Sequence, residues 1–265
     1  MKMSDRISSF QASPIRRLSS HARSAVRRGI TVYHLNIGQP DIRKPRGVLD
    51  AIHEYDEPII AYGSSEGDER LRSALPAYYA TYGVRIRPEE ILITTGGSEA
   101  LLFTFMTLCD PGDRIVIPEP FYTNVSSFAH SAMVELVPVT SRLEDGFALP
   151  PIEDFERLID PKTKAILLCS PNNPTGHVYS KEDLEEILRL CAKHDIFLVV
   201  DEVYREFCYD GEEFTSILTF EEYADRVVCV DSFSKRYSMC GARVGMLVSR
   251  NRQFLTDTLK LSQAR

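Results

Sequence analysis

Seven short apolar runs recur after residue 90 and form the clearest pattern in the chain. They cover residues 91–95, 114–117, 134–139, 165–169, 196–201, 227–231 and 244–249. Most have the composition of buried strands, and segments with helical periodicity, such as 99–108 and 181–193, separate them. This alternation predicts an α/β fold in which a mostly parallel, seven-stranded sheet carries helices on both faces.

Two helix ends can be interpreted directly. Ser180 and Asp183 have the spacing of a capping pair at the start of the helix 181–193. The last segment, 251–265, begins with helical spacing of its apolar residues but shows no C-cap before the chain stops. We therefore expect that a C-terminal portion has been lost and that the small domain is incomplete.

Polar and glycine-containing segments follow several of the apolar runs. They are residues 96–98, 119–122, 170–176, 201–204 and 232–235. In open α/β sheets, ligands bind beyond the carboxyl ends of the strands. The sequence therefore predicts a ligand site assembled from these segments.

The N-terminal segment has two interpretations. Its arginines and serines, with Asp5 as the one acidic residue before position 30, resemble an organelle transit peptide. Alternatively, Ser13-Pro14 starts a helix that ends at Gly29, with an apolar stripe of Ile15, Leu18, Ala22, Ala25 and Val26. We favour the helix because it continues without a linker into the apolar segment 32–37.

Composition narrows the class of protein. The 265 residues are 43% apolar and 26% charged, as in ordinary globular proteins. A net charge of −7 argues against partners such as nucleic acid or an anionic membrane, which select cationic surfaces. No apolar stretch is long enough to cross a bilayer, and the six cysteines lack metal-ligand spacing. We expect reduced cysteines, no metal, and a cytoplasmic location.

The segment 232–245 contains the most specific chemistry. Lys235 lies in a polar, glycine-containing turn directly after an apolar run. Its amine can condense with an aldehyde, Ser232 and Ser234 can bind an anion, and the guanidinium of Arg243 can neutralise a phosphate. These are the requirements of pyridoxal phosphate, although the segment alone is also typical of a strand followed by a solvated loop.

Several motifs in a fixed order identify a family. They are Gly96-Gly97-Ser98-Glu99-Ala100, Ser170-Pro171-Asn172-Asn173-Pro174-Thr175-Gly176, Asp201-Glu202-Val203-Tyr204, and Ser232-Phe233-Ser234-Lys235 with Arg243 and Gly245. With them the chain resembles the class I and II aminotransferases, which are pyridoxal-phosphate enzymes of the aspartate aminotransferase fold. The resemblance extends from the N-terminal helix through residues 36–41 to about residue 250.

The resemblance implies roles for the residues around the cofactor ring. Lys235 would hold the cofactor as an internal aldimine and then move the proton between the substrate Cα and the cofactor. Asp201 would pair with the pyridine nitrogen, and Asn173 with Tyr204 would hydrogen-bond the phenolic oxygen. Lys235, Asp201 and Tyr204 are thus the predicted catalytic residues. Tyr122 would stack on the ring.

The resemblance also implies a phosphate site and a substrate site. Phosphate ligands would come from Gly97, Ser98, Ser232, Ser234 and Arg243. Tyr62 would reach the phosphate of a neighbouring subunit, which implies a homodimer. Gly38 and Asn173 would contact the substrate. The peptide bonds before Pro120 and Pro174 are expected to be cis.

The pattern is incomplete at its C-terminal end. We predict an N-terminal arm with part of the small domain in residues 1–45, a large cofactor-binding domain in 46–250, and the start of a truncated interdomain helix in 251–265. Related enzymes bind the substrate's α-carboxylate through an arginine beyond this point. We therefore expect the chain to hold pyridoxal phosphate but to transaminate poorly.

Three functions stay open at this stage. The first is an aminotransferase that moves an amino group between an L-amino acid and a 2-oxo acid. The second is a pyridoxal-phosphate lyase on the same scaffold, and the third is a noncatalytic fragment. Ser98 adds no positive charge that would select an acidic side chain, so the amino donor is also open.

Overall fold

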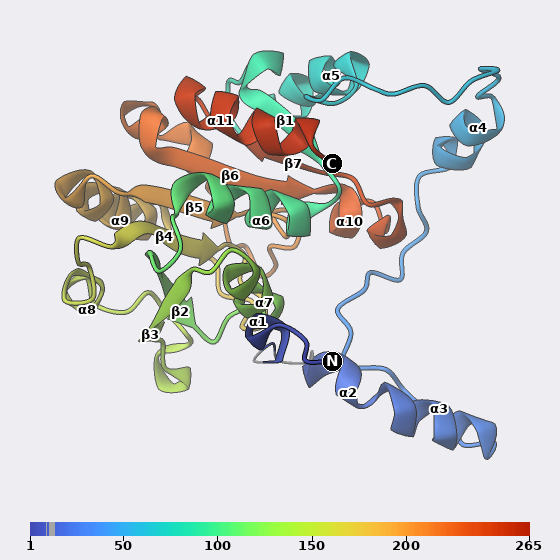
Figure 1. The fold of residues 1–265 in the computed structure, drawn as a ribbon, viewed down its shortest axis with the longest axis horizontal. Coiled ribbons are helices and arrows are strands. Elements are labelled where there is room, and N and C mark those ends of the chain that lie inside the picture. The colour runs from blue at the N-terminus through green and yellow to red at the C-terminus, as the bar shows by residue number, and fades with distance from the viewer. Residues whose placement is uncertain (9, 11–13) are drawn as a thin grey trace.

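The computed structural model describes residues 1–8, 10 and 14–265, and its main body is a seven-stranded sheet (Figure 1). The strands are β1 (Ile91–Thr94), β2 (Arg114–Glu119), β3 (Glu135–Thr140), β4 (Thr163–Cys169), β5 (Phe197–Asp201), β6 (Val227–Ser232) and β7 (Gly245–Val248). Each of the seven apolar runs thus corresponds to a strand, and the ends of each strand lie within two residues of the ends of the run. The predicted α/β fold is confirmed.

The sheet has the order β1-β7-β6-β5-β4-β2-β3. Four neighbouring pairs are parallel, and β7 is antiparallel to both β1 and β6. The sheet is therefore mostly parallel, as predicted. The carboxyl ends of β4, β5 and β6 consequently lie along one edge of the sheet.

Seven helices belong to the body of the described chain. They are α5 (Glu69–Ala80), α6 (Gly97–Leu108), α7 (Asn124–Ser131), α8 (Ile152–Glu156), α9 (Lys181–His194), α10 (Phe233–Arg236) and α11 (Arg252–Gln263). Short 3₁₀ turns cover η1 (Pro88–Glu90), η2 (Leu143–Asp145), η3 (Ile217–Thr219), η4 (Glu221–Arg226) and η5 (Cys240–Ala242). Ser180 caps α9 as predicted, since its Oγ accepts a 3.0 Å hydrogen bond from the Asp183 N–H.

The core has two layers, one on each face of the sheet. Ile166 and Leu168 of β4 belong to the layer covered by α5, α8 and α9, whereas Ala165 and Leu167 belong to the layer covered by α6, α7 and α11. Successive strand residues point to opposite faces, so a strand buried on both sides is apolar throughout. This explains why the strands appear in the sequence as continuous apolar runs.

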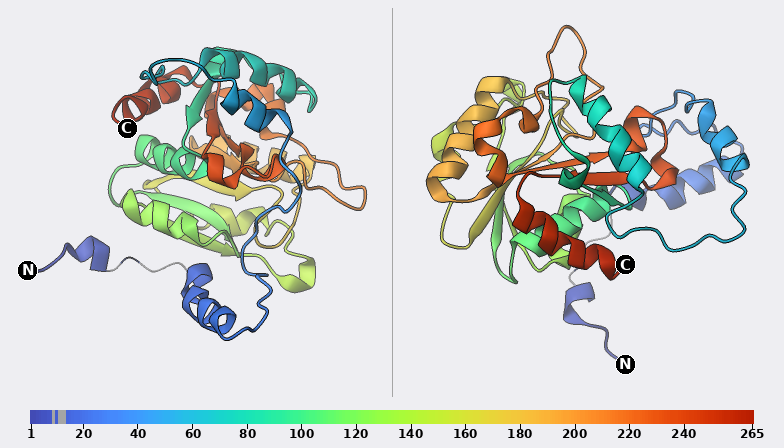
Figure 2. Two further views of the ribbon diagram at one scale, coloured as in Figure 1. Left: turned by 90° about the vertical axis from the view of Figure 1, so that its right-hand side faces the viewer. Right: turned by 90° about the horizontal axis from the view of Figure 1, so that it is seen from above.

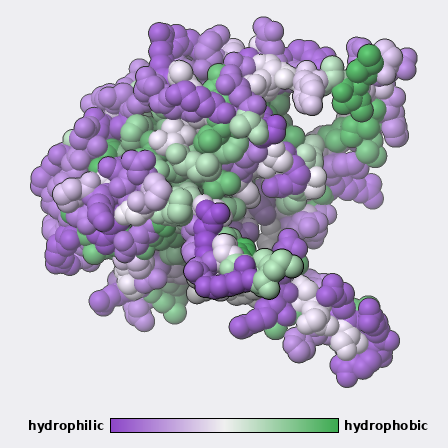
Figure 3. Space-filling model, viewed as in Figure 1, coloured by the Kyte–Doolittle hydropathy of each residue, from purple (hydrophilic) through white to green (hydrophobic). Residues whose placement is uncertain are grey.

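The N-terminal segment, here defined as residues 1–66, is built differently. It contains α1 (Asp5–Ser8), α2 (Pro14–Arg17), α3 (Ser19–Arg27) and α4 (Gly47–His53), joined by extended chain outside the body (Figures 1 and 2). None of its described residues is buried, and the first buried residue along the chain is Gly67. Apolar surface is visible around α4 (Figure 3), where Ile59 and Ile60 are 73% and 89% exposed.

The predicted N-terminal helix is confirmed in part. Residues 14–17 and 19–27 are helical, with an interruption at Leu18. The apolar stripe of this helix is not covered by the rest of the described chain, because Leu18 and Val26 are each 56% exposed and α3 has no buried residue. Periodicity can indicate a helix without a surface to pack against. The predicted start at Ser13 lies outside the described residues.

Within the described residues, no helix combines the length and apolar character needed to span a membrane. Nor does the described part of the chain contain a cluster of three or more side chains suited to holding a metal ion.

Candidate active site

A cavity of about 290 Å³ lies at the carboxyl ends of the central strands. Its lining includes every site residue predicted from the sequence except Tyr62. These are Gly38, Gly97, Ser98, Tyr122, Asn173, Asp201, Tyr204, Ser232, Ser234, Lys235 and Arg243. Because β4 ends at Cys169, β5 at Asp201 and β6 at Ser232, the strand ends bring these distant sequence segments together.

Lys235 is presented to this cavity by α10, the single helical turn that follows β6. Ser232 begins that turn, and its Oγ accepts a 3.1 Å hydrogen bond from the Ser234 N–H. The Lys235 Nζ donates a 2.6 Å hydrogen bond to the Gly38 carbonyl and lies 5.5 Å from the centre of the Tyr204 ring. The amine is therefore positioned between the strand ends and the N-terminal segment.

Asp201 ends β5 and lines the same cavity. Its Oδ1 accepts a 3.1 Å hydrogen bond from the Val203 N–H. The pKa of Asp201 is raised to about 7. Burial is the main cause and the charges of Asp231 and Glu202 add to it, whereas the hydrogen bond from Val203 and the charge of Lys235 act in the opposite direction. A cationic ligand group at Asp201 would therefore stabilise the ionised carboxylate.

Asn173 and Tyr204 come from the loops after β4 and β5. The Asn173 Nδ2 donates a hydrogen bond of 3.2 Å to the Tyr204 hydroxyl. Burial raises the pKa of Tyr204, so the phenol is a neutral hydrogen-bond donor near pH 7. The two side chains thus form a pair that can bind an anionic oxygen.

Three peptide bonds near the cavity are cis. They precede Pro120, Pro171 and Pro174. The predictions for Pro120 and Pro174 are confirmed, and the bond before Pro171 was not predicted.

A candidate anion site lies where the turn after β1 enters α6. Gly96 precedes α6 with φ 78°, and the backbone N–H groups of Gly97 and Ser98 are at the helix N-terminus. The Arg243 guanidinium closes over this turn, because a Cβ on Gly96 would lie 2.6 Å from its Nη2. A Cβ on Gly245 would lie 2.6 Å from the Gly97 backbone nitrogen. Gly245 is therefore needed for the close approach of β7 to this turn, whereas Gly96 permits the positive φ at its own position.

Tyr122 and Tyr62 have different positions. Tyr122 lines the cavity, and its hydroxyl accepts a 2.7 Å hydrogen bond from the Asn124 Nδ2. Tyr62 does not line it and is 106% exposed on the chain after α4. The stacking role of Tyr122 and the intersubunit role of Tyr62 stay predictions, as do the other roles assigned from the resemblance.

The cavity also contains residues that the sequence analysis did not select. They are Arg16, Asn36, Ile37, Leu101, Asn124, Phe128, Cys169, Val203 and Cys240. Most belong to the helices and loops that carry the predicted motifs. Arg16 instead comes from α2, and nothing in the sequence distinguishes it from the other arginines of the N-terminal segment.

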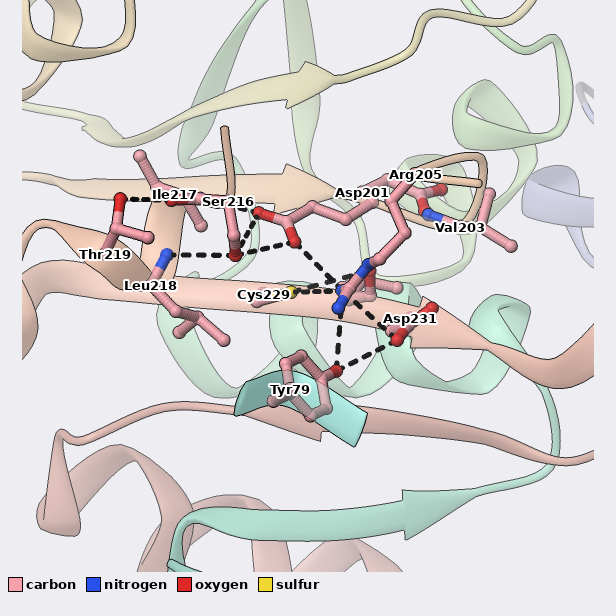
Figure 4. A network of polar contacts seen from close by, with 12 residues as sticks. Tyr79, Asp201, Val203, Arg205, Ser216, Ile217, Leu218, Thr219, Cys229 and Asp231 are labelled. Carbon is pink, nitrogen blue, oxygen red and sulfur yellow. Dashed lines mark hydrogen bonds and ion pairs between the residues drawn. The ribbon is translucent and has the colours of Figure 1, made fainter. Parts of the chain in front are cut away.

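Behind the cavity lies a buried ion network that the sequence analysis missed (Figure 4). Arg205 pairs with Glu202 at 2.9 Å and with Asp231 at 3.1 Å, and all three side chains are 0% exposed. Asp231 also pairs with Arg236 and accepts a 2.9 Å hydrogen bond from the Tyr79 hydroxyl. The two carboxylates and two guanidiniums balance in charge, which makes their burial tolerable.

Aromatic rings complete this network. Some nitrogens of Arg205 and Arg236 have no hydrogen-bond partner. However, the guanidinium carbon of Arg205 lies 4.5 Å from the ring centre of Tyr79, and that of Arg236 lies 4.4 Å from the ring centre of Tyr78. Cation–π contacts thus cover the faces of both cations. Because Glu202 and Arg236 directly follow Asp201 and Lys235, the network anchors both cavity residues.

Comparisons with known proteins agree on one family. The family model for aminotransferase class I and II matches residues 30–264. The chain is 35% identical over 249 residues to an aspartate aminotransferase of Thermotoga maritima, which covers 93% of this chain and 66% of that protein. It is 32% identical over 253 residues to aromatic-amino-acid aminotransferase 2 of Thermococcus litoralis, which covers 94% of this chain and 64% of that protein.

The fold is also similar to the folds of solved aminotransferase structures. The crystal structure of the Thermotoga maritima aspartate aminotransferase matches with a TM-score of 0.93 at 34% identity, covering 99% of this chain and 70% of that chain. The Thermus thermophilus aspartate aminotransferase with maleate matches with a TM-score of 0.89 at 30% identity, covering 100% of this chain and 68% of that chain. The present chain spans 66% and 64% of the length of the two curated relatives named above.

Proposed function

Because this chain belongs to the class I and II aminotransferases, we propose that it binds pyridoxal phosphate through Lys235 and moves an amino group between an L-amino acid and a 2-oxo acid. One observation carries the proposal. A single cavity is lined by a lysine amine, a carboxylate that a neighbouring cation would ionise, and an anion site at a helix N-terminus. Each matches one reactive part of the cofactor.

The residues present fit pyridoxal phosphate. Gly97, Ser98 and Arg243 supply N–H donors and positive charge for the phosphate, with the hydroxyls of Ser232 and Ser234 beside them. Asp201 would pair with the protonated ring nitrogen. Tyr204 and Asn173 would bind the ring oxygen, and Tyr122 would pack against the ring. When bound, the cofactor supplies an aldehyde and a ring that accepts electron density from the substrate Cα.

The protein's own groups have separate tasks. The Lys235 Nζ would bond to the aldehyde carbon with loss of water. As a free amine it would take the proton from the substrate Cα and deliver it to the former aldehyde carbon. Asp201 would keep the ring nitrogen protonated, since an ionised carboxylate and a cation stabilise each other. The Tyr204–Asn173 pair donates hydrogen bonds to an anionic oxygen without adding charge. The ion network holds Asp201 and Lys235 at the ends of β5 and β6 through Glu202 and Arg236.

A donor-only experiment tests the reaction. The chain is loaded with pyridoxal phosphate and mixed with single amino acids, without any 2-oxo acid. An aminotransferase would yield one equivalent of pyridoxamine phosphate for each bound cofactor. Ammonia and pyruvate released from cysteine would instead identify the lyase, and a loaded protein that does neither would identify the noncatalytic alternative.

We also propose a homodimer as the functional unit. The support is the exposed apolar surface of the N-terminal segment, including Ile59, Ile60 and Tyr62, for which a second copy is a suitable partner. Sedimentation of the wild type and of Tyr62→Ala tests this proposal. A monomeric wild type would contradict it, whereas a dimeric Tyr62→Ala variant with weakened cofactor binding would support a role for this tyrosine across the interface.

The proposed location is the cytoplasm. All six cysteines are free thiols in the structure, which suits a reducing compartment. Fractionation of cells that express the chain would test this location.

A further inference from the structure

The cavity contains one cation that the proposed cofactor does not require. Its lining has three cationic side chains, those of Arg16, Lys235 and Arg243, and one carboxylate, that of Asp201. Lys235 is assigned to the aldehyde and Arg243 to the phosphate. Arg16 has no counterpart in the cofactor.

The positions of the other two cations support this division. The Arg243 Nη1 donates to the Cys240 carbonyl at 2.9 Å, and its Nη2 donates to the Thr95 carbonyl at 3.4 Å, which fixes the guanidinium beside the anion site. The Lys235 Nζ is bonded to the Gly38 carbonyl. Within the described residues, by contrast, no hydrogen bond or ion pair holds the exposed Arg16 side chain. The N–H donors of the Arg16 guanidinium are therefore available to a ligand in the cavity.

A second observation shows that the charge of Arg16 acts inside the cavity. Burial raises the pKa of Tyr122, and the charge of Asp201 raises it further, whereas the charges of Arg16 and Arg243 lower it. Arg16 thus acts electrostatically on the side chain that is proposed to cover the cofactor ring. A substrate joined to the cofactor would occupy the same space.

We propose that Arg16 binds a carboxylate group of the amino-acid substrate. The inference rests on the proposed function, because the amino acid enters a cavity that already holds the cofactor. A guanidinium binds a carboxylate with two parallel hydrogen bonds, which orients the acid as well as neutralising it. Asp201 is the one acidic side chain among the described residues of the lining, so protein side chains repel a substrate carboxylate little.

The carboxylate can have two sources, and its chemistry is the same in both. The α-carboxylate is present in every amino acid, whereas a side-chain carboxylate is present only in acidic ones. Propionate and succinate separate these sources, because they carry one and two carboxylates. Succinamide is the uncharged analogue.

The test measures binding of these three probes to the full chain loaded with pyridoxal phosphate, by titration calorimetry and by the shift in cofactor absorbance. Arg16→Met should weaken succinate binding about tenfold, which corresponds to about 1.4 kcal/mol. Arg16→Lys should recover part of the affinity, because lysine keeps the positive charge but lacks the two parallel N–H donors of a guanidinium. Arg17→Met is the matched control, since Arg17 is the adjacent arginine of α2 and does not line the cavity. Its succinate affinity should stay within about twofold of wild type.

The outcomes are distinct. Equal weakening of propionate and succinate in Arg16→Met supports binding of the α-carboxylate, and weakening of succinate alone supports a side-chain carboxylate. Unchanged succinate binding in Arg16→Met overturns the inference. If pyridoxal phosphate affinity falls at the same time, Arg16 contacts the cofactor instead of the substrate. A wild type that does not take up pyridoxal phosphate contradicts the proposed function itself, and the inference with it.

Discussion

The body of the molecule, residues 67–265, and the N-terminal segment contribute to the same cavity but are stabilised differently. The body encloses two apolar layers around the sheet and supplies the proposed cofactor residues from strand ends. None of the described residues of the N-terminal segment is buried, yet the segment places Arg16 and Gly38 at the cavity. Segments with few buried contacts open at low free-energy cost. The cofactor side of the cavity is therefore built on a rigid support, and the proposed substrate side on an adaptable one.

The largest effect should come from breaking the buried ion network in the body. Arg205→Met leaves Glu202 and Asp231 buried without their shared cation, and should lower the free energy of unfolding by about 3–5 kcal/mol. Arg189→Met is the control, because Arg189 pairs with Glu185 on the surface of α9, and its loss should cost less than about 0.5 kcal/mol. Urea unfolding of both variants measures the difference, and equal costs would contradict the assigned role of burial.

Gly245→Ala should have the next largest effect. The added methyl group would meet the backbone of Gly96 and Gly97, which cannot move without disturbing the start of α6. We expect about 2–3 kcal/mol of destabilisation and weaker binding of pyridoxal phosphate. Gly241→Ala is the matched control, because nothing lies within 4 Å of its added Cβ. Thermal unfolding and a cofactor titration of the two variants provide the test, and a Gly245→Ala protein indistinguishable from Gly241→Ala would refute this account of the turn.

The ionisation of Asp201 should give a smaller, pH-dependent effect. Its pKa is raised to about 7 in the folded protein, so the folded state without cofactor holds a proton that the unfolded state releases. The contribution of Asp201 to the free energy of unfolding is fully present below about pH 4 and is lost as the pH rises to about 7. Relative to Asp201→Asn, the free energy of unfolding of the wild type should fall by roughly 1–2 kcal/mol over that range. The effect is no larger because the side chain is only partly buried and solvent screens its charge. Denaturation between pH 4 and 8 tests this, and a parallel profile for the two proteins would exclude the raised pKa.

The smallest effect should come from the N-terminal segment. Leu35 is 95% exposed, so Leu35→Ala should change the free energy of unfolding by less than about 0.5 kcal/mol. Leu184→Ala in α9 removes a fully buried side chain and should cost about 2–5 kcal/mol. Urea unfolding at a protein concentration low enough to dissociate the proposed homodimer compares them. A large cost for Leu35→Ala would show that the segment packs on a core after all.

The fold was largely predictable because its strands are buried on both faces. Such strands leave continuous apolar runs in the sequence, and the residues that follow them, such as Asp201 and Lys235, are then placed at one edge of the sheet. The cis peptide bonds before Pro120 and Pro174 followed from the family resemblance alone. The same resemblance supplied Tyr62, whose role no contact in the structure tests.

Other features could not be predicted, for physical reasons. The apolar spacing of α3 indicates a helix, but periodicity does not reveal whether a surface covers it. The partners Arg205 and Asp231 are far apart in sequence, and their pairing depends on the parallel alignment of β5, which Arg205 follows, with β6. Arg16 reaches the cavity only through the path of the N-terminal segment. Tertiary packing, rather than local sequence, decides these three features.

The most direct test of the central claim is to identify the amino group that binds the cofactor. The chain is incubated with pyridoxal phosphate, reduced with borohydride, digested, and analysed by mass spectrometry. We expect the reduced adduct on Lys235, and Lys235→Ala should abolish both the adduct and the visible absorbance. Lys181→Ala, at the exposed start of α9, should leave both intact. An unchanged adduct yield and absorbance in Lys235→Ala would contradict it.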